Sequence, residues 1–177
     1  MAFTTPATST AGTVLTASFL NTYVRDNVAW MATDSPSCRA YNNANISIPD
    51  STFTAVTLNS ERFDNAALHS TSSNTSRLTV PTGGGGKYVI GLGANWTASA
   101  SGALRTTRIE QNATTVLGTF TSQPSASHGS DQSWSTIYAL SDADYVEMYV
   151  FQNSGGALNL TSVANSSPEF WTFWMRT

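Results

Sequence analysis

The sequence of 177 residues contains few charges, and this scarcity excludes several functions. Charged residues make up 11% of the chain, the net charge is −3, and lysine occurs once, at Lys87. A protein that wraps nucleic acid needs clustered Lys and Arg to neutralise phosphates, so we expect no nucleic-acid partner. No apolar run approaches the ~18 residues that span a bilayer, so we expect no membrane insertion.

The residues that carry most enzyme and metal chemistry are also scarce. The single cysteine, Cys38, excludes an intrachain disulfide and a cysteine-based zinc site. Two histidines, His69 and His128, leave little material for histidine-dependent catalysis, and the sequence has no G-x-S-x-G nucleophile elbow. The glycine run before Lys87 lacks the Ser or Thr and the helix that a phosphate-binding loop requires. We therefore expect a non-enzymatic protein without a cofactor.

Two groups of acidic residues are weak candidates for a cation site. Asp142 and Asp144 precede a strong strand, and Glu61, Asp64 and His69 lie close together in the sequence. Oxygen-ligated calcium sites usually need several converging carboxylates and carbonyls, and spacing alone does not ensure that convergence. A role in turn formation through their side-chain acceptors is the simpler interpretation of Asp142 and Asp144.

One segment near the N-terminus has the periodicity of a helix. From Ala17 to Met31 apolar residues recur at three- and four-residue steps, and Thr16 precedes them as an N-cap. A 4-3-4 spacing, typical of a short coiled-coil seam, joins Leu20, Val24, Asn27 and Met31. A helix this short is marginal alone, so we expect these residues to anchor or trimerise the protein. Residues 1–36 form this segment, and Thr33–Ser37 is the expected linker because Pro36 disfavours a helix before it.

Residues 37–177 change to short strands separated by turn signals, which predicts an all-β sandwich. No βαβ alternation is present, so a parallel nucleotide-binding sheet is not expected. Tyr88–Trp96 has the pattern of a central strand, with Tyr88 and Trp96 in the core. The other expected strands are Arg39–Tyr41, Asn45–Ile48, Thr52–Leu58, Arg77–Val80, Leu104–Gln111, Thr115–Phe120, Ser133–Leu140, Tyr145–Gln152, Ala157–Val163 and Phe170–Met175.

Two of these strands carry large apolar side chains on both faces. Such strands need cover on both faces, and one small sandwich buries only one. A neighbouring subunit would cover the other. The trimer-interface candidates on this argument are Tyr145, Tyr149, Phe151, Trp171 and Trp174.

The N-terminal segment resembles the leader of many virion proteins of tailed bacteriophages. The matching residues are Thr5-Pro6, then Gly12 to Ala17, Leu20-Asn21 and Val24-Arg25-Asp26-Asn27. The resemblance implies a segment that attaches the protein to the virion.

The remainder resembles C1q/TNF-like jelly rolls as they occur in phages and bacteria. The matching residues are Glu61-Arg62-Phe63-Asp64 with His69, Leu78 to Tyr88, Arg108-Ile109, Leu140, Asp144-Tyr145-Val146, Gln152 to Gly155 and the aromatic final strand. This resemblance implies a ten-stranded jelly roll, a tight homotrimer and a location in the virion. Asn112-Ala113 and Asp142-Ala143-Asp144 depart from the family pattern in two turns, so no ion site is carried over.

The combined interpretation is a phage virion structural protein whose trimeric head projects as a tail fibre tip, head fibre or capsid decoration. The loops Ser70–Ser76 and Ser122–Gln132 would bind a glycan or protein of the host surface. One alternative is a cement or adaptor protein of capsid, neck or tail that binds only other virion subunits. Another is a polysaccharide hydrolase, which needs paired carboxylates in a groove, whereas acidic residues are scattered along this sequence.

Overall fold

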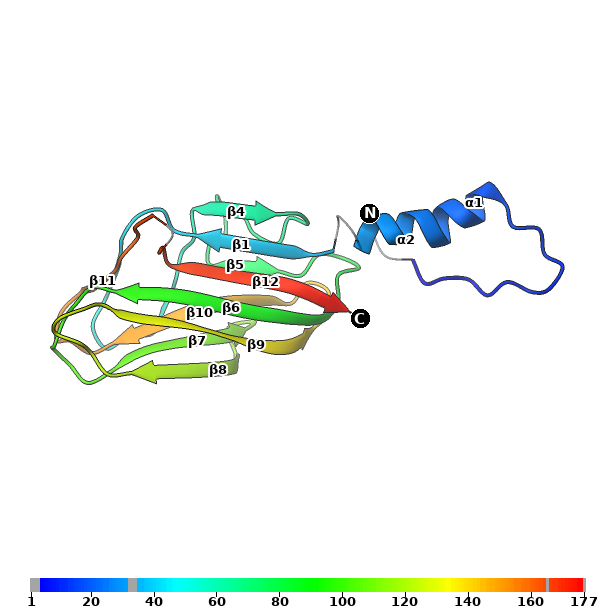
Figure 1. Ribbon diagram of the computed structural model, residues 1–177. Coiled ribbons are helices and arrows are strands. Elements are labelled where there is room, and N and C mark those ends of the chain that lie inside the picture. Colours follow the sequence, from blue (N-terminus) through cyan, green and yellow to red (C-terminus); the bar gives the residue numbers. More distant parts are fainter. Residues whose placement is uncertain (1–3, 32–34, 165, 177) are drawn as a thin grey trace.

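The computed structural model describes residues 4–31, 35–164 and 166–176, and it shows a β-sandwich with a helix beside one end (Figure 1). The seven-stranded sheet has the order β2-β11-β6-β12-β1-β4, with β9 paired to β6. The five-stranded sheet has the order β3-β10-β7-β8, with β5 paired to β10. The strand pairs are antiparallel, and the all-β sandwich expected from the sequence is confirmed.

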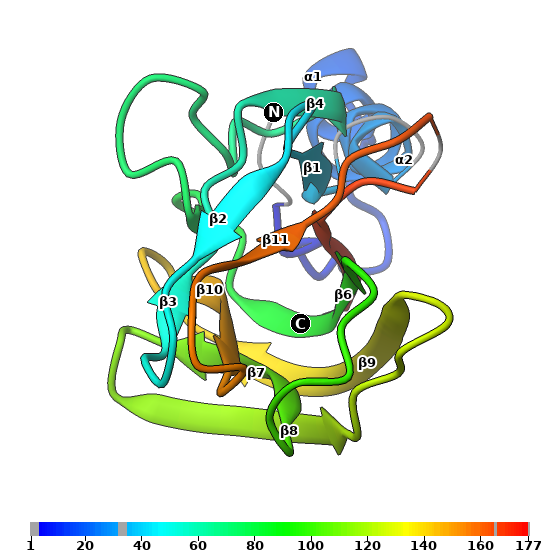
Figure 2. The same ribbon diagram turned by 90° about the vertical axis from the view of Figure 1, so that its left-hand side faces the viewer.

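The two sheets are assembled from segments that are far apart in the chain (Figure 2). The seven-stranded sheet contains β1 (Ser37–Tyr41), β2 (Ile46–Ile48), β4 (Ser60–Asp64), β6 (Gly86–Trp96), β9 (Ser130–Leu140), β11 (Leu158–Leu160) and β12 (Glu169–Arg176). The five-stranded sheet contains β3 (Thr54–Ala55), β5 (Arg77–Thr79), β7 (Arg105–Gln111), β8 (Thr115–Ser122) and β10 (Tyr145–Gln152).

Strand β6 is the centre of the seven-stranded sheet, with β9 on one side and β12 on the other. Its alternate side chains point into the sandwich and are fully or almost fully buried: Tyr88, Ile90, Leu92, Ala94 and Trp96. The core positions predicted for Tyr88 and Trp96 are therefore confirmed. The inner residues of β10, Val146, Met148 and Val150, pack in the same core from the opposite sheet.

The edges of the sheets differ from the sequence prediction. Strand β4 was not predicted, because it is an edge strand without the alternation of exposed and buried residues that identifies a half-buried strand. The predicted strand Thr52–Leu58 shortens to β3, because the Val56 amide bonds to Met148 while the Leu58 amide bonds to Thr75. Short strands β3 and β5 both pair with β10, so the described residues form more strands than the ten that the resemblance implies.

The helix begins where the sequence predicts. It consists of α1 (Ala17–Leu20), a π-helical stretch η1 (Asn21–Arg25) and α2 (Asp26–Ala29). The Thr16 side chain accepts a hydrogen bond from the Phe19 amide at 3.1 Å, as expected of an N-cap. Among the described residues no helix is long and apolar enough to cross a membrane. The predicted linker Thr33–Ser37 lies partly outside the described residues.

We predict that Tyr88 is a major source of stability. Its ring is fully buried, and its hydroxyl donates a hydrogen bond of 2.6 Å to the Gly84 carbonyl in the glycine turn before β6. Tyr88→Ala should lower the free energy of unfolding by about 3–5 kcal/mol, because it leaves a large cavity. The control Tyr88→Phe keeps the ring and should lose only about 1 kcal/mol. Urea unfolding measures both, and an unchanged Tyr88→Ala curve would refute the assignment.

Candidate functional site

The N-terminal helix presents an apolar surface that the described chain leaves open. Leu20, Val24 and Met31 are each about half exposed, and Val28 lies with them. These are three of the four residues predicted to anchor or trimerise the protein. An exposed apolar stripe of this kind favours a partner outside the chain.

Asn27, the fourth anchoring candidate, serves a contact within the chain. It is buried, its Oδ1 accepts a hydrogen bond from the Thr4 amide at 2.9 Å, and its Nδ2 donates one to the Thr4 carbonyl at 2.7 Å. This pair of bonds holds the segment around Thr4 against the helix. The 4-3-4 seam assumed an α-helix throughout, whereas η1 is wound more widely and changes the angular spacing of these residues.

The leader and the jelly roll are joined by aromatic contact. Trp30 is 3% exposed, and its ring packs edge-on against Trp174 with the centroids 4.6 Å apart. The Trp174 amide also donates a hydrogen bond to the Pro36 carbonyl. Trp174 faces the core side of β12, so this trimer-interface candidate already has neighbours in its own chain. Trp30, a residue of the leader, is thus buried against the jelly roll.

Three trimer-interface candidates lie on the outer face of the five-stranded sheet. The Arg77 guanidinium covers the Tyr145 ring at 3.9 Å. Phe151 packs against Phe53 with the ring centroids 5.0 Å apart, and the Arg108 guanidinium lies 3.6 Å from the Phe53 centroid and 5.4 Å from that of Tyr149. The chain thus provides cover for Tyr145, Tyr149 and Phe151 by itself. These contacts supply part of the cover that the interface prediction expected from a neighbouring subunit, and the place of these three residues in an interface stays a prediction.

The outer face of the seven-stranded sheet carries a larger uncovered apolar surface. Phe173, Val89 and Ile137 stand in register across β12, β6 and β9, and the Phe173 and Ile137 side chains are 53% and 59% exposed. Phe63 and Trp171 lie beside Phe173 around a hollow of about 350 Å³. We call Phe63, Ile137, Trp171 and Phe173 the apolar patch. It contains one predicted interface residue, Trp171.

The carboxylates of Asp142 and Asp144, one of the two candidate cation sites, accept hydrogen bonds from N–H donors of the chain. The Asp142 carboxylate accepts from the Gly83 and Gly85 amides, both at 2.7 Å, and so closes the glycine turn. The Asp144 carboxylate accepts from the side chains of Gln111 and Asn112 and from the Ser141 amide. Within the described residues no group of three or more His, Cys, Asp or Glu side chains could hold a metal ion. Both aspartates therefore act in turns, the simpler role considered for them.

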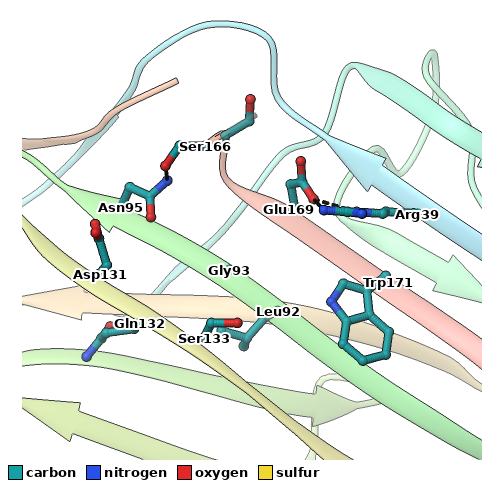
Figure 3. A pocket seen from close by; sticks show the side chains of 11 residues that line it. Arg39, Leu92, Gly93, Asn95, Asp131, Gln132, Ser133, Ser166, Glu169 and Trp171 are labelled. Atoms are coloured by element: carbon teal, nitrogen blue, oxygen red, sulfur yellow. Dashed lines mark hydrogen bonds and ion pairs between the residues drawn. The ribbon is translucent and has the colours of Figure 1, made fainter. Parts of the chain in front are cut away.

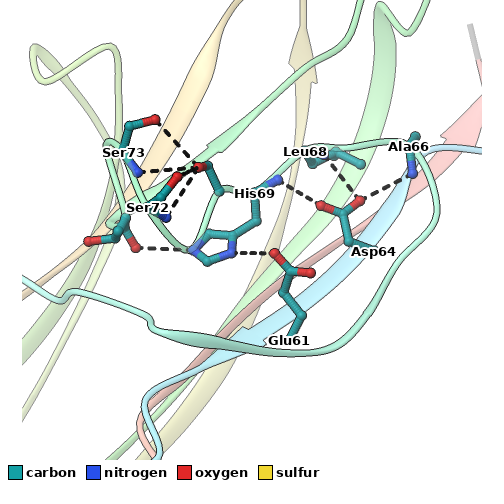
Figure 4. A network of polar contacts seen from close by, with 9 residues as sticks. Glu61, Asp64, Ala66, Leu68, His69, Ser72 and Ser73 are labelled. Atoms are coloured by element: carbon teal, nitrogen blue, oxygen red, sulfur yellow. Dashed lines mark hydrogen bonds and ion pairs between the residues drawn. The ribbon is translucent and has the colours of Figure 1, made fainter.

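Glu61, Asp64 and His69 form a network that fixes a loop (Figure 4). Asp64 accepts hydrogen bonds from the amides of Ala66, Leu68 and His69. The His69 ring is 2.9 Å from the Glu61 carboxylate through Nδ1 and 3.1 Å from the Thr75 carbonyl through Nε2. Both partner atoms are oxygen acceptors, so a ring nitrogen that carries a proton can donate to its partner.

The two predicted recognition loops are not brought together. The Ser70–Ser76 loop follows the His69 network, whereas Ser122–Gln132 joins β8 to β9 on the other side of the sandwich (Figure 2). A single ligand of small size would therefore contact one of them. Cys38 is buried, and burial, with the nearby charges of Asp64 and Glu61, raises the pKa of its thiol, so it is a packed residue rather than a nucleophile.

The fold creates one carboxylate pair that the sequence did not suggest. Glu110 and Glu147 stand directly opposite each other on β7 and β10. Burial and the charges of both glutamates raise the pKa of the neighbouring Tyr149. Each carboxylate is buried and bound by an arginine, Glu110 by Arg108 and Glu147 by Arg77. Because both carboxylates are buried and paired with arginine, they are unlike the free, groove-lining carboxylates that a polysaccharide hydrolase uses.

Asp144 makes the stability of the turn before β10 depend on pH. Burial raises the pKa of its carboxyl, but the hydrogen bonds from Asn112, Ser141 and Gln111 outweigh this effect and hold the pKa below its ordinary value of 3.8. The stabilisation is present above 3.8 and is lost as the pH falls through the lowered pKa. Asp144→Asn should therefore destabilise the protein at neutral pH, and the difference from the natural protein should shrink in acid.

Denaturant unfolding at neutral and acidic pH measures this change. Asp131→Asn is the matched control, because within the described residues the exposed Asp131 side chain makes no hydrogen bond or ion pair. A difference for Asp144→Asn that stayed constant down to strongly acidic pH would contradict the role assigned to the carboxylate.

Comparisons with known proteins give structural neighbours only. No family model and no curated protein matches the sequence. The crystal structure of murine APRIL at pH 5.0 matches with a TM-score of 0.59 and 8% identity, over 79% of this chain and 98% of that one. The globular domain of zebrafish complement 1qA protein matches with a TM-score of 0.56 and 18% identity, over 80% of this chain and 99% of that one. The chain therefore has the C1q/TNF-like jelly-roll fold.

Proposed function

We propose that the protein is a non-enzymatic structural protein of a tailed-phage virion, with a trimeric jelly-roll head that projects from the particle and adheres to the host surface. The observation that carries this proposal is a C1q/TNF-like jelly roll attached to a leader with an exposed apolar helix face. The likeness of that leader to virion attachment segments supports the virion location. Binding partners are other copies of the chain, other virion proteins and a glycan or protein of the host.

The apolar patch supports the trimer. An exposed, contiguous apolar surface on a soluble domain favours association with another protein surface. Phe173 and Ile137 lie in the C-terminal halves of β12 and β9. Both strands end on the side of the sandwich nearer the helix, so contacts through the patch and through the helix would act together (Figure 1). Homo-oligomers are usually closed and symmetric, and three copies around an axis would bring three patches and three helices together.

We predict that a charge in the apolar patch prevents assembly without unfolding the chain. The natural protein should have about three times the chain mass of 18.8 kDa in native mass spectrometry or light scattering. Ile137→Asp should give monomers, because an unpaired carboxylate in a closed interface is strongly disfavoured. Val116→Asp is the matched control: Val116 is 49% exposed on β8, in the other sheet. A monomeric natural protein, or an Ile137→Asp variant that stays trimeric, would refute this interface.

A second prediction concerns attachment to the particle. The double variant Leu20→Asp and Val24→Asp should be lost from virions when it is the only copy supplied, because charges on a buried apolar stripe carry a desolvation penalty. The control Ser18→Asp and Asn21→Asp adds the same charge at exposed polar positions of the same helix. Point variants are preferred to a chain beginning at Ser37, because removing Trp30 would uncover Trp174. Normal copy number of the double variant on particles would contradict the anchor assignment.

The cement or adaptor alternative predicts the same trimer and the same attachment. It differs in that particles lacking the protein would adsorb normally to host cells, and in that the isolated trimer would not bind those cells. Locating the protein in a virion density map distinguishes a projecting head from a subunit enclosed by others. An intracellular protein absent from purified particles would overturn both versions.

A further inference from the structure

A pocket lies at the end of the sandwich that is opposite the helix (Figure 1). Strand β1 runs away from the helix and ends at Tyr41, and β12 begins on the same side at Glu169, which is paired with Tyr41. The pocket has a volume of about 280 Å³, and its lining includes Tyr41, Asn43, Arg62, Ser162 and Ser167. Residues of one strand end, one edge strand and two loops therefore meet there.

The pocket borders an excess of positive charge. Arg39 donates from Nε to Oε2 of Glu169 at 2.6 Å, as Figure 3 shows, and Arg62 donates from Nε to Oε1 at 2.7 Å. Two guanidinium groups thus share one carboxylate, and each of its oxygens already has a partner. The carboxylates of β4, Glu61 and Asp64, are bonded to the loop shown in Figure 4. The group formed by Glu169 and its two arginines therefore keeps one net positive charge.

The polar groups that line the pocket are mainly hydrogen-bond donors. Asn59 accepts from the Asn43 amide at 3.0 Å through Oδ1 and donates to Oδ1 of Asn43 at 2.9 Å through Nδ2. This reciprocal pair occupies the Asn43 carbonyl oxygen and leaves its Nδ2 group available. The buried Ser167 hydroxyl accepts from another serine at 3.1 Å and keeps its own proton.

Two further donors belong to the stacked pair of Arg62 and Tyr41. Among the described residues, Nη1 of Arg62 and the Tyr41 hydroxyl have no hydrogen-bond partner, and the described lining contains no carboxylate. A pocket with several donors, one guanidinium and no acidic side chain favours an anionic ligand.

We propose that this pocket binds the anionic group of an acidic glycan. The Arg62 guanidinium lies 4.6 Å from the centroid of the Tyr41 ring and is held by Glu169, so its position is set before a ligand arrives. The carboxylate or phosphate of the glycan bonds to Arg62, and Asn43 and Ser167 donate to its remaining oxygens. The volume is at the lower limit of small-molecule sites and suits one sugar ring.

The proposal rests on the adhesive function above, and it adds the ligand class and a site outside both predicted recognition loops. The pocket and the apolar patch share no lining residue. Phe173 of the patch pairs with Ser37 at the start of β1, whereas the pocket begins at Tyr41, where that strand ends. Subunit contact through Phe173 therefore leaves the pocket at the end of the head that faces away from the leader.

Titration calorimetry and NMR on the full-length protein test the ligand class. Glucuronic acid, glucose 1-phosphate and glucose present one ring with a carboxylate, a phosphate or no charge, and N-acetylneuraminic acid is a second carboxylate probe. We expect at least one acidic probe to bind, with an affinity that falls as salt is added, and glucose not to bind. The stronger of the carboxylate and phosphate probes identifies the kind of acidic glycan. If no acidic probe binds, or if inorganic phosphate binds as tightly as the best of them, the glycan site is overturned.

Asn43→Asp tests the pocket while it keeps the contact that orients residue 43. One aspartate oxygen still accepts from Nδ2 of Asn59, and the other places a negative charge where the Asn43 donor stood. The best acidic probe should bind about tenfold or more weakly, because like charges repel. Asn74→Asp is the matched control, since it makes the same change in the exposed loop before β5 and should bind normally.

Arg62→Gln is the second variant, because Glu169 keeps its bond to Arg39 when the Arg62 guanidinium is removed. It should also weaken binding about tenfold or more. If Asn43→Asp and Arg62→Gln bind the acidic probe as the natural protein does, the pocket assignment is wrong.

Adsorption to host cells separates failure of this site from failure of the adhesive function. If Asn43→Asp adheres as well as the natural protein, adhesion stands and the pocket is wrong. If the natural protein itself does not adhere, the adhesive function is wrong. Loss of adhesion in Asn43→Asp, with Asn74→Asp unaffected, supports both.

Discussion

The alternation of side chains along β6 is the constraint on which the rest of the structure depends. This strand has a hydrogen-bonded neighbour on each side for almost its whole length, so its backbone polar groups are paired inside the protein. Its inward residues are large and fill the core, with Tyr88 and Trp96 at the two ends. Its outward residues change from Val89 to Gly91 and Gly93, and this change divides the outer surface into an apolar and a polar half.

The apolar side chains on the two outer faces of the sandwich are covered by their own chain to different extents. On the five-stranded sheet, Arg77, Arg108 and Phe53 cover the aromatic rings of β10, so that face is largely satisfied by its own chain. On the seven-stranded sheet, Phe173 and Ile137 have no such cover. The second face is therefore the surface that we propose for subunit contact.

Three of the carboxylates of the chain organise turns and loops. Asp64, Asp142 and Asp144 each accept hydrogen bonds from two or three N–H donors. Hydrogen bonds to a charged acceptor are stronger than those between neutral groups, which explains how long Ser- and Gly-rich turns are held with little apolar contact. It also explains why the spacing of acidic residues suggested cation sites: the same side chains that could ligate a metal suit exposed amide groups.

The sequence by itself determined the local features that depend on neighbouring residues. The central-strand pattern identified β6, and large apolar residues on both faces identified β10. The Thr16 cap and the apolar spacing identified the helix, and the density of turn signals identified an all-β sandwich. The edge strand β4, which has no alternation, was not detectable in this way. The C1q/TNF-like fold was reached through a resemblance and is supported by solved structures with the same arrangement.

Tertiary structure alone decided which side chains share a surface. Trp30 meets Trp174 across most of the chain, Glu110 meets Glu147 through strand register, and Tyr145 is covered by Arg77 from another strand. The pocket beside Arg62 likewise needs the end of β1, strand β4 and the loop before β12 side by side, three segments that are not neighbours in the sequence. Contacts of this kind follow from sheet order and register, which are set by the packing of the whole core. A local pattern of residues in the sequence therefore does not predict them.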